Sequence, residues 1–179
     1  MIIRFHAFLH SVRNGLLISF WALPLTVFPL AGQSQEGGRA VLVTGASSGL
    51  GLKMTEVLAA NGYFVYAGAR SPEDLQRLDA MENVKSVRLD VTDLGEIAAA
   101  AAMIQAEGRG LHGLVNIAGV AVVGPLIEMP DEVMQFQLEV NLFGPYRVTK
   151  AFAPLLIESG GRIMTTSSLN GIVSSTFLG

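Results

Sequence analysis

Residues 44–51 read Thr-Gly-Ala-Ser-Ser-Gly-Leu-Gly, and the segments on either side of this stretch decide the fold. The apolar run at 40–44 predicts a buried strand, and residues 50–61 predict a helix. Three glycines let the backbone turn tightly and approach another group closely. The helix amino terminus adds free N–H groups and partial positive charge. The arrangement predicts a binding loop for phosphate groups, the alternative being a tight turn that binds nothing.

Strands and helices alternate along the rest of the chain. The strand predictions depend on β-branched and aromatic runs, and the helix predictions on start signals such as Ser71-Pro72. The expected strands are 62–69, 84–89, 111–117 and 161–167, and the expected helices begin at 71–72, 93 and 131, the last running to 158 with a break allowed at Gly144-Pro145. This alternation predicts an α/β fold with a doubly wound parallel sheet of about five strands.

Composition excludes several classes of protein. The chain has 179 residues, 50% of them hydrophobic and 15% charged, which suits one globular domain and is too apolar for a disordered chain. A formal net charge of −3 gives no basic footprint for nucleic acid. Because the sequence contains no cysteine, it can form neither a disulfide nor a thiolate zinc site.

The first 32 residues differ from the rest. Arg4 and Arg13 precede an uncharged apolar run at 15–31 that ends in small residues, which predicts a secretory signal or a membrane anchor. The protein would then be exported or membrane-associated. A helix of the globular domain and a misassigned start codon are the alternatives, and the latter would make the protein cytoplasmic. Residues 33–38 predict a polar linker, and the globular domain is expected over 39–179.

Several motifs at predicted strand ends resemble those of the short-chain dehydrogenase/reductase family. Besides Thr-Gly-x-x-x-Gly-x-Gly, they are Asp90-Val91, the run Asn116-Ile117-Ala118-Gly119, Asn141 and Ser167-Ser168. The resemblance runs from about residue 39 to the end. It implies a Rossmann-type NAD(P)-binding domain, reversible hydride transfer between a nicotinamide and an alcohol or carbonyl, and a homo-oligomer. The cofactor-binding residues it implies are Thr44, Gly45, Ser47, Ser48, Gly49, Leu50, Gly51, Arg70, Asp90, Val91, Asn116, Ala118 and Gly119.

The end of the second predicted strand indicates which nicotinamide cofactor binds. An acid that would accept hydrogen bonds from the ribose 2′-hydroxyl of NAD is absent from residues 67–71, where Arg70 stands instead. Arg70 can clamp a 2′-phosphate, and Ser47 can add a donor, so we expect NADP(H) over NAD(H). The alternative is a solvated Arg70 near Glu73 or Asp74. By resemblance Asp90 bonds the adenine amino group, although an Asp there can also be a helix cap.

The resemblance assigns catalysis to a tyrosine, a lysine, a serine and an asparagine. Asn141 and Ser168 match two of them. Tyr146 and Lys150 have the family's spacing, but they precede the strand that leads to Ser168, whereas the family's pair follows the serine on the next helix. That position falls beyond Gly179, so we expect a truncated chain that is inactive alone. The alternative is a catalytically silent dinucleotide-binding or membrane-anchored scaffold protein.

Two further expectations concern apolar segments. Residues 120–129 are largely apolar, which favours a lipophilic alcohol or ketone as substrate, although Val122 and Val123 could equally pack on the sheet edge. A chain that ends at Gly179 leaves the strand at 161–167 as an exposed apolar edge, and such edges promote aggregation.

Overall fold

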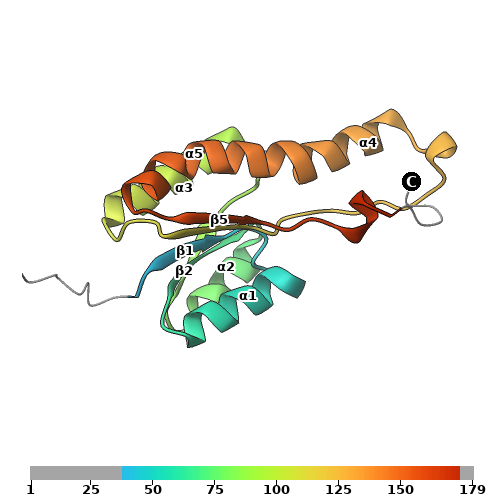
Figure 1. Ribbon diagram of the computed structural model, residues 1–179. Helices are drawn as coiled ribbons and strands as arrows, with labels where there is room; N and C mark the ends of the chain where they lie inside the picture. The colour runs from blue at the N-terminus through green and yellow to red at the C-terminus, as the bar shows by residue number, and fades with distance from the viewer. Residues whose placement is uncertain (1–37, 174–179) are drawn as a thin grey trace, which may run out of the picture. The chain divides into compact units, whose positions relative to one another are not determined.

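The computed structural model describes residues 38–173 (Figure 1). The predicted signal-like segment and nearly all of the predicted linker lie outside this range, as do residues 174–179. Within 38–173, no helix has the length and apolar character needed to span a bilayer.

Within residues 38–173, five parallel strands form one sheet in the order β3-β2-β1-β4-β5. Their bounds are Ala40–Val43 for β1, Phe64–Ala69 for β2, Val84–Arg88 for β3, Gly113–Asn116 for β4 and Arg162–Thr165 for β5. The chain winds outward from β1 to β3 and then crosses to β4 on the other side. The predicted doubly wound sheet is therefore confirmed, and in such sheets the carboxyl edge at the point of reversal is where ligands bind.

Helices cover both faces of the sheet (Figure 1). Helix α1 (Gly49–Ala60) and helix α2 (Pro72–Asp79) lie on one face, and α3 (Leu94–Glu107) and α5 (Gly144–Glu158) lie on the other. Neighbouring side chains of β1 show why both faces need cover. Leu42 packs into the core beneath α3 and α5, and Val43 packs into the core beneath α1 and α2.

The helix predicted over residues 131–158 is divided into three parts. Helix α4 (Asp131–Leu138) continues into a π-helical turn, Glu139–Phe143, and then into α5. The break allowed at Gly144-Pro145 therefore lies a few residues earlier than the sequence predicts. Pro145 has no N–H to donate to the carbonyl of residue 141, so regular α-helical bonding already fails upstream of the proline.

Strand β5 is an open edge within the described part of the chain. All four of its residues are exposed, and the side chains of Ile163 and Met164 are 48% and 43% accessible. The predicted exposed apolar edge is confirmed over these residues.

Candidate functional site

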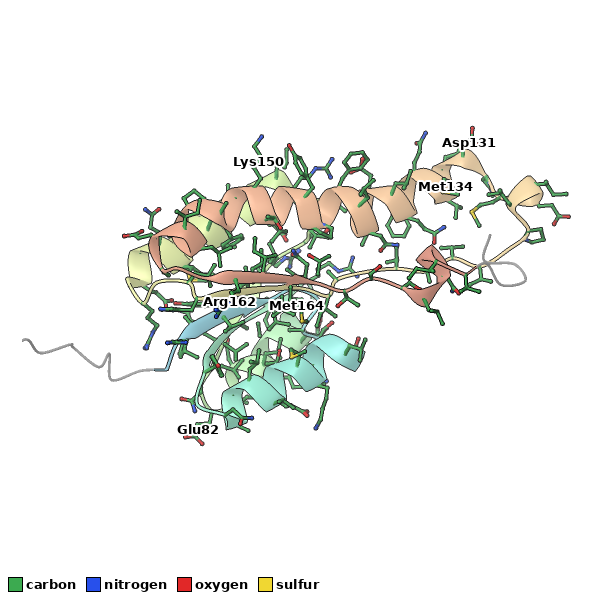
Figure 2. All side chains as sticks on the ribbon, viewed as in Figure 1. Glu82, Asp131, Met134, Lys150, Arg162 and Met164 are labelled. Carbon is green, nitrogen blue, oxygen red and sulfur yellow. The ribbon has the colours of Figure 1, made fainter. Side chains whose placement is uncertain are left out.

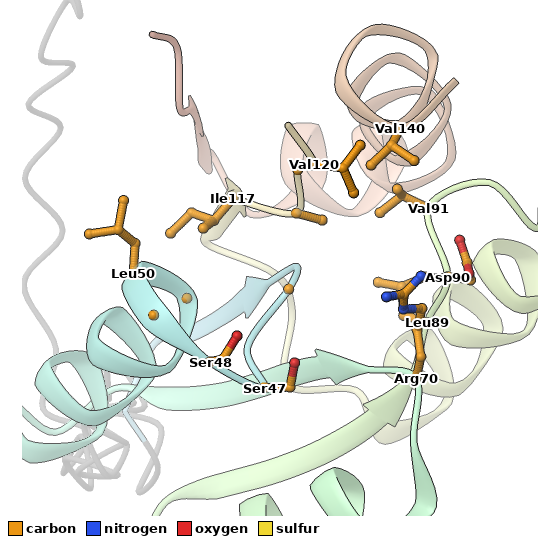
Figure 3. A pocket seen from close by; sticks show the side chains of 15 residues that line it. Ser47, Ser48, Leu50, Arg70, Leu89, Asp90, Val91, Ile117, Val120 and Val140 are labelled. Atoms are coloured by element: carbon orange, nitrogen blue, oxygen red, sulfur yellow. Dashed lines mark ion pairs between the residues drawn. The ribbon is translucent and has the colours of Figure 1, made fainter. Parts of the chain in front are cut away.

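A cavity of about 360 Å³ opens at the carboxyl edge of the sheet (Figure 3). Its lining brings together the ends of four strands, which are distant in sequence. The predicted cofactor residues that line it are Gly45, Ser47, Ser48, Gly49, Leu50, Gly51, Arg70, Asp90, Val91, Ala118 and Gly119. Four apolar residues that the sequence reasoning missed also line it, namely Leu89, Ile117, Val120 and Val140. Each of the four is a direct neighbour of a predicted site residue, Val140 being next to Asn141, and this adjacency is the signal that could have found them.

The glycine loop is held tightly beneath this cavity. Gly45 has a left-handed φ of 66°, and a Cβ on it would lie 2.8 Å from the Cα of Ala118. The next residue, Ala46, donates its N–H to the carbonyl of Gly68 over 2.8 Å. The loop is thereby fixed between β2 and the segment after β4.

The amino terminus of α1 faces the cavity without a capping side chain. Ser48 is the N-cap residue and makes no side-chain bond to the first turn of the helix. Since Ser48, Gly49 and Gly51 all line the cavity, the first N–H groups of α1 are placed beside it. An uncapped helix start of this kind suits an anionic group.

Arg70 follows directly after β2 and turns toward the end of β3 (Figure 3). Its Nη1 lies 3.5 Å from Oδ2 of Asp90, and its side chain is 67% exposed. Asp90, rather than Glu73 or Asp74, is thus the ion-pair partner of Arg70, and the arginine is otherwise largely exposed to solvent, as the alternative interpretation expects. A long, exposed ion pair of this kind holds the guanidinium only weakly.

Asp90 is held as a hydrogen-bond acceptor in the cavity wall. Its Oδ1 accepts from the N–H and the hydroxyl of Thr92 over 2.9 and 2.7 Å. Burial raises the pKa of this carboxyl, but the bonds from Thr92 and the charge of Arg70 outweigh burial and keep the pKa below its ordinary value. The helix-cap alternative is wrong, because the cap of α3 is Asp93, which accepts from Gly95 and Glu96.

Two predicted cofactor residues lie outside the lining of this cavity. Thr44 is buried, and its hydroxyl accepts from the N–H groups of Ile117 and Ala118 over 3.0 and 3.1 Å. Asn116 is also buried and donates to the hydroxyls of Thr149 and Thr165 over 3.2 and 3.4 Å. Thr44 therefore holds the segment after β4 from behind, whereas Asn116 ties the end of β4 to α5 and β5.

A second cavity, of about 550 Å³, continues from the first. The two cavities share residues 117–120, and the second brings Asn141 and Ser168 together. Asn141 lies in the π-helical turn and binds the backbone of Val120 twice, accepting from its N–H over 2.9 Å and donating to its carbonyl over 2.7 Å. Ser168 accepts from the N–H of Asn170 over 3.2 Å and begins a short 3₁₀ turn.

Tyr146 and Lys150 lie apart from both of these cavities. They line a neighbouring depression with Thr149, Thr165 and Pro145, the last of which also lines the second cavity. Tyr146 is 60% exposed, and Nζ of Lys150 lies 6.0 Å from the centre of its ring. The structure therefore does not bring this pair together with Asn141 and Ser168.

The sheet, the glycine loop and the paired cavities define a dinucleotide-binding domain, and the family model for short chain dehydrogenases matches residues 39–178. The chain belongs to this family of oxidoreductases.

Curated relatives support the assignment. The chain is similar to the mitochondrial D-beta-hydroxybutyrate dehydrogenase of Bos taurus, with 36% identity over 75% of this chain and 42% of that protein. It is also 36% identical to the NADPH-dependent 1-acyldihydroxyacetone phosphate reductase of Saccharomyces cerevisiae, over 81% of this chain and 50% of that protein. The chain thus spans about half the length of the curated relatives it matches.

Solved structures show the same architecture. A variant of the actinorhodin polyketide ketoreductase, determined with NADPH, superposes with a TM-score of 0.73 and 32% identity, covering 79% of this chain and 57% of that one. Serine dehydrogenase from Escherichia coli gives a TM-score of 0.72 and 31% identity, covering 78% of this chain and 66% of that one.

Proposed function

We propose that this chain binds NADP(H) in preference to NAD(H) and supplies the cofactor site for hydride transfer between the nicotinamide and an alcohol or ketone. The observation that carries the proposal is Arg70, a weakly held guanidinium in the wall of the cavity, at a strand end that has no acid. The names of two related proteins point the same way, since the yeast relative is an NADPH-dependent reductase and the actinorhodin ketoreductase was determined with NADPH.

Each part of the cavity has a role in this proposal. The uncapped start of α1 receives the pyrophosphate, and Arg70 with Ser47 receives the 2′-phosphate. The carboxylate of Asp90 accepts from the adenine amino group, as its lowered pKa allows at neutral pH. When bound, the nicotinamide supplies the hydride donor or acceptor, which belongs in the second cavity.

Asn141 and Ser168 act on the substrate side of the site. Ser168 offers a hydroxyl to the carbonyl or alcohol oxygen from the wall of the second cavity. The amide of Asn141 already bonds both backbone groups of Val120, so its role here is to fix the segment between the two cavities. Exposed apolar side chains on residues 122–127, among them Val123 and Ile127, favour a lipophilic substrate next to Ala121 of the cavity wall.

Proton transfer is not provided by Tyr146 and Lys150 in this proposal. Because they line a neighbouring depression and not the second cavity, we expect the 179-residue chain to bind cofactor without turning over substrate by itself. The same separation favours the second candidate function, a dinucleotide-binding protein that performs no chemistry. Oxidation of NADPH by a ketone in the presence of the full chain would contradict both the expected lack of turnover and the second candidate function. If this activity were lost in Tyr146→Phe, proton transfer would be assigned to Tyr146.

Cofactor selectivity is tested by measuring the dissociation constants of NADPH and NADH by calorimetry. We expect the wild-type chain to favour NADPH, and Arg70→Glu to lower this preference by about 10- to 100-fold, because it replaces a charge-assisted bond with repulsion. The matched control is Arg39→Glu. It makes the same charge change just before β1, at the amino ends of the strands and thus away from the cavity at their carboxyl ends. An unchanged preference in Arg70→Glu would contradict the proposal.

A further inference from the structure

Arg77, on helix α2, reaches the glycine loop from outside the cavity. Its Nη2 donates to the backbone carbonyl of Ser47 over 2.5 Å and to Oδ1 of Asp74 over 2.6 Å. Ser47 lies 30 positions earlier in the sequence and lines the cavity (Figure 3). Arg77 itself is absent from the lining of the cavity. It therefore holds one wall of the site from behind.

The carboxylate that Arg77 contacts is itself fixed in place. The hydroxyl of Ser71 donates to Oδ2 of Asp74 over 2.8 Å, and the N–H of Asp74 donates back to that hydroxyl over 3.1 Å. Ser71 is the N-cap of α2 and directly follows Arg70. A continuous set of polar contacts thus links Ser47, on the glycine loop, with the segment that carries Arg70.

The charge of Arg77 matters as much as its hydrogen bonds. Helix α2 has Glu73 and Asp74 in its first turn, close to Arg70 in sequence. An unpaired carboxylate at that place would repel a phosphate group beside Arg70 and Ser47. By pairing with Asp74 and contacting Ser47 at once, the guanidinium of Arg77 offsets this repulsion and fixes Ser47, the loop residue that we propose contacts the 2′-phosphate.

We infer that Arg77 is a positioning residue for the 2′-phosphate of NADP(H), acting through the carbonyl of Ser47 and the carboxylate of Asp74. The inference rests on the proposed function, because only NADP(H) carries that phosphate. NAD(H) uses the same glycine loop for its pyrophosphate but places no charge at the ribose. A purely structural role for Arg77 would weaken both cofactors alike, whereas the positioning role weakens NADPH alone.

The test measures the dissociation constants of NADPH and NADH for the full-length Arg77→Ala, Arg77→Gln and Arg77→Lys variants. We expect Arg77→Ala to weaken NADPH by about 3- to 10-fold and NADH by less than about 2-fold. Arg77→Lys restores most of the NADPH affinity, because it keeps the charge and a donor. Arg77→Gln restores less, because it keeps a donor without the charge. Should Arg77→Ala fail to fold, the comparison of the lysine and glutamine variants gives the same answer.

The matched control is Lys53→Ala. Lys53 pairs with Glu56 at a spacing of three residues on the exposed side of α1, as Arg77 pairs with Asp74 on α2, but its hydrogen bond goes to Glu56 and not to the glycine loop. We expect Lys53→Ala to leave both dissociation constants unchanged. A second check is Asp74→Asn, in whose background the effect of Arg77→Ala on NADPH should shrink, because the carboxylate whose repulsion Arg77 offsets is then already neutral.

The outcomes separate this inference from the proposed function. If the wild type prefers NADPH and Arg70→Glu reverses the preference, but Arg77→Ala changes both cofactors equally or neither, only the role of Arg77 is overturned. If the wild type does not prefer NADPH, or Arg70→Glu has no effect, the proposed function fails and the inference fails with it.

Discussion

Gly45 and Gly49 share a left-handed backbone but not the same surroundings. The φ angles are 66° and 52°, yet a Cβ on Gly45 would lie 2.8 Å from the Cα of Ala118, whereas a Cβ on Gly49 would meet nothing within 4 Å. Strain from the backbone alone costs an alanine about 1 kcal/mol, and a clash with backbone atoms adds to it.

We therefore expect Gly45→Ala to lower the free energy of unfolding by about 2–4 kcal/mol and Gly49→Ala by about 1 kcal/mol. Urea unfolding followed by circular dichroism measures both. Equal losses would show that the contact with Ala118 contributes nothing.

At the scale of the residue, sequence patterns predict which side chains gather but not what each one contacts. Parallel strands place their carboxyl ends together, so Gly45, Arg70 and Asp90 could be assigned to one site from the sequence alone. Whether Thr44 faces a cofactor or the segment after β4 depends on its side-chain direction in the folded sheet. The pairing of Arg70 with Asp90 likewise depends on the β2–β3 register, which aligns Ala69 with Arg88.

At the scale of the element, the π-helical turn and the segment after β4 are joined by Asn141. We expect Asn141→Ala to lower the free energy of unfolding by about 1–3 kcal/mol, because it removes two hydrogen bonds to Val120. Amide hydrogen exchange in Asn141→Ala should increase at residues 118–122 in particular. Unchanged exchange there would show that Asn141 does not hold this segment. The free energy of unfolding of Asn141→Asp should lie between those of the wild type and Asn141→Ala. A carboxylate accepts from the N–H of Val120 but repels its carbonyl.

Glu107 joins the end of α3 to two strands and should make stability depend on pH. It accepts from the hydroxyl of Tyr66 on β2 over 2.9 Å and pairs with Lys85 on β3. Burial raises the pKa of Glu107, but Lys85 and Tyr66 outweigh burial and lower it. Because the pKa of Glu107 is lower in the folded than in the unfolded chain, its ionised form adds stability at pH values above the unfolded pKa of about 4.3. This stability is lost as the pH falls through the folded pKa.

We therefore expect Glu107→Gln to destabilise the protein at neutral pH and progressively less below about pH 4. Urea unfolding at several pH values measures the difference. Glu56→Gln is the control, because its pair with Lys53 is an exposed one and contributes little. A loss in Glu107→Gln that is the same at every pH would contradict the ionic contribution.

The strands and most helices follow from local patterns, whereas the π-helical turn does not. Ser71 with Pro72 and Asp93 begin α2 and α3 as their sequences predict, because a helix cap is a local interaction. The turn at 139–143 combines a missing N–H at Pro145 with the burial of Val140 in the core, and only the proline is visible in the sequence.

At the scale of the whole molecule, the sheet has two unequal edges. Within residues 38–173, β3 ends one edge and β5 the other, and all four residues of β5, of which Figure 2 labels Arg162 and Met164, are exposed. Ile163 and Met164 point to opposite faces because neighbouring residues of a strand alternate. Unpaired backbone groups flanked by exposed apolar side chains form a template for pairing with another strand.

We expect this edge to drive self-association of the chain, and Met164→Lys to reduce it, because a charged side chain on an edge strand opposes pairing. Sedimentation velocity over a range of concentrations measures the change, with a monomer of 19.0 kDa as the reference. Val57→Lys is the control, since Val57 is exposed to a similar extent, 45%, on helix α1 away from the edge. Both variants keep residues 1–37, so association through that segment is common to them. If Met164→Lys and Val57→Lys sediment alike, β5 is not the associating edge.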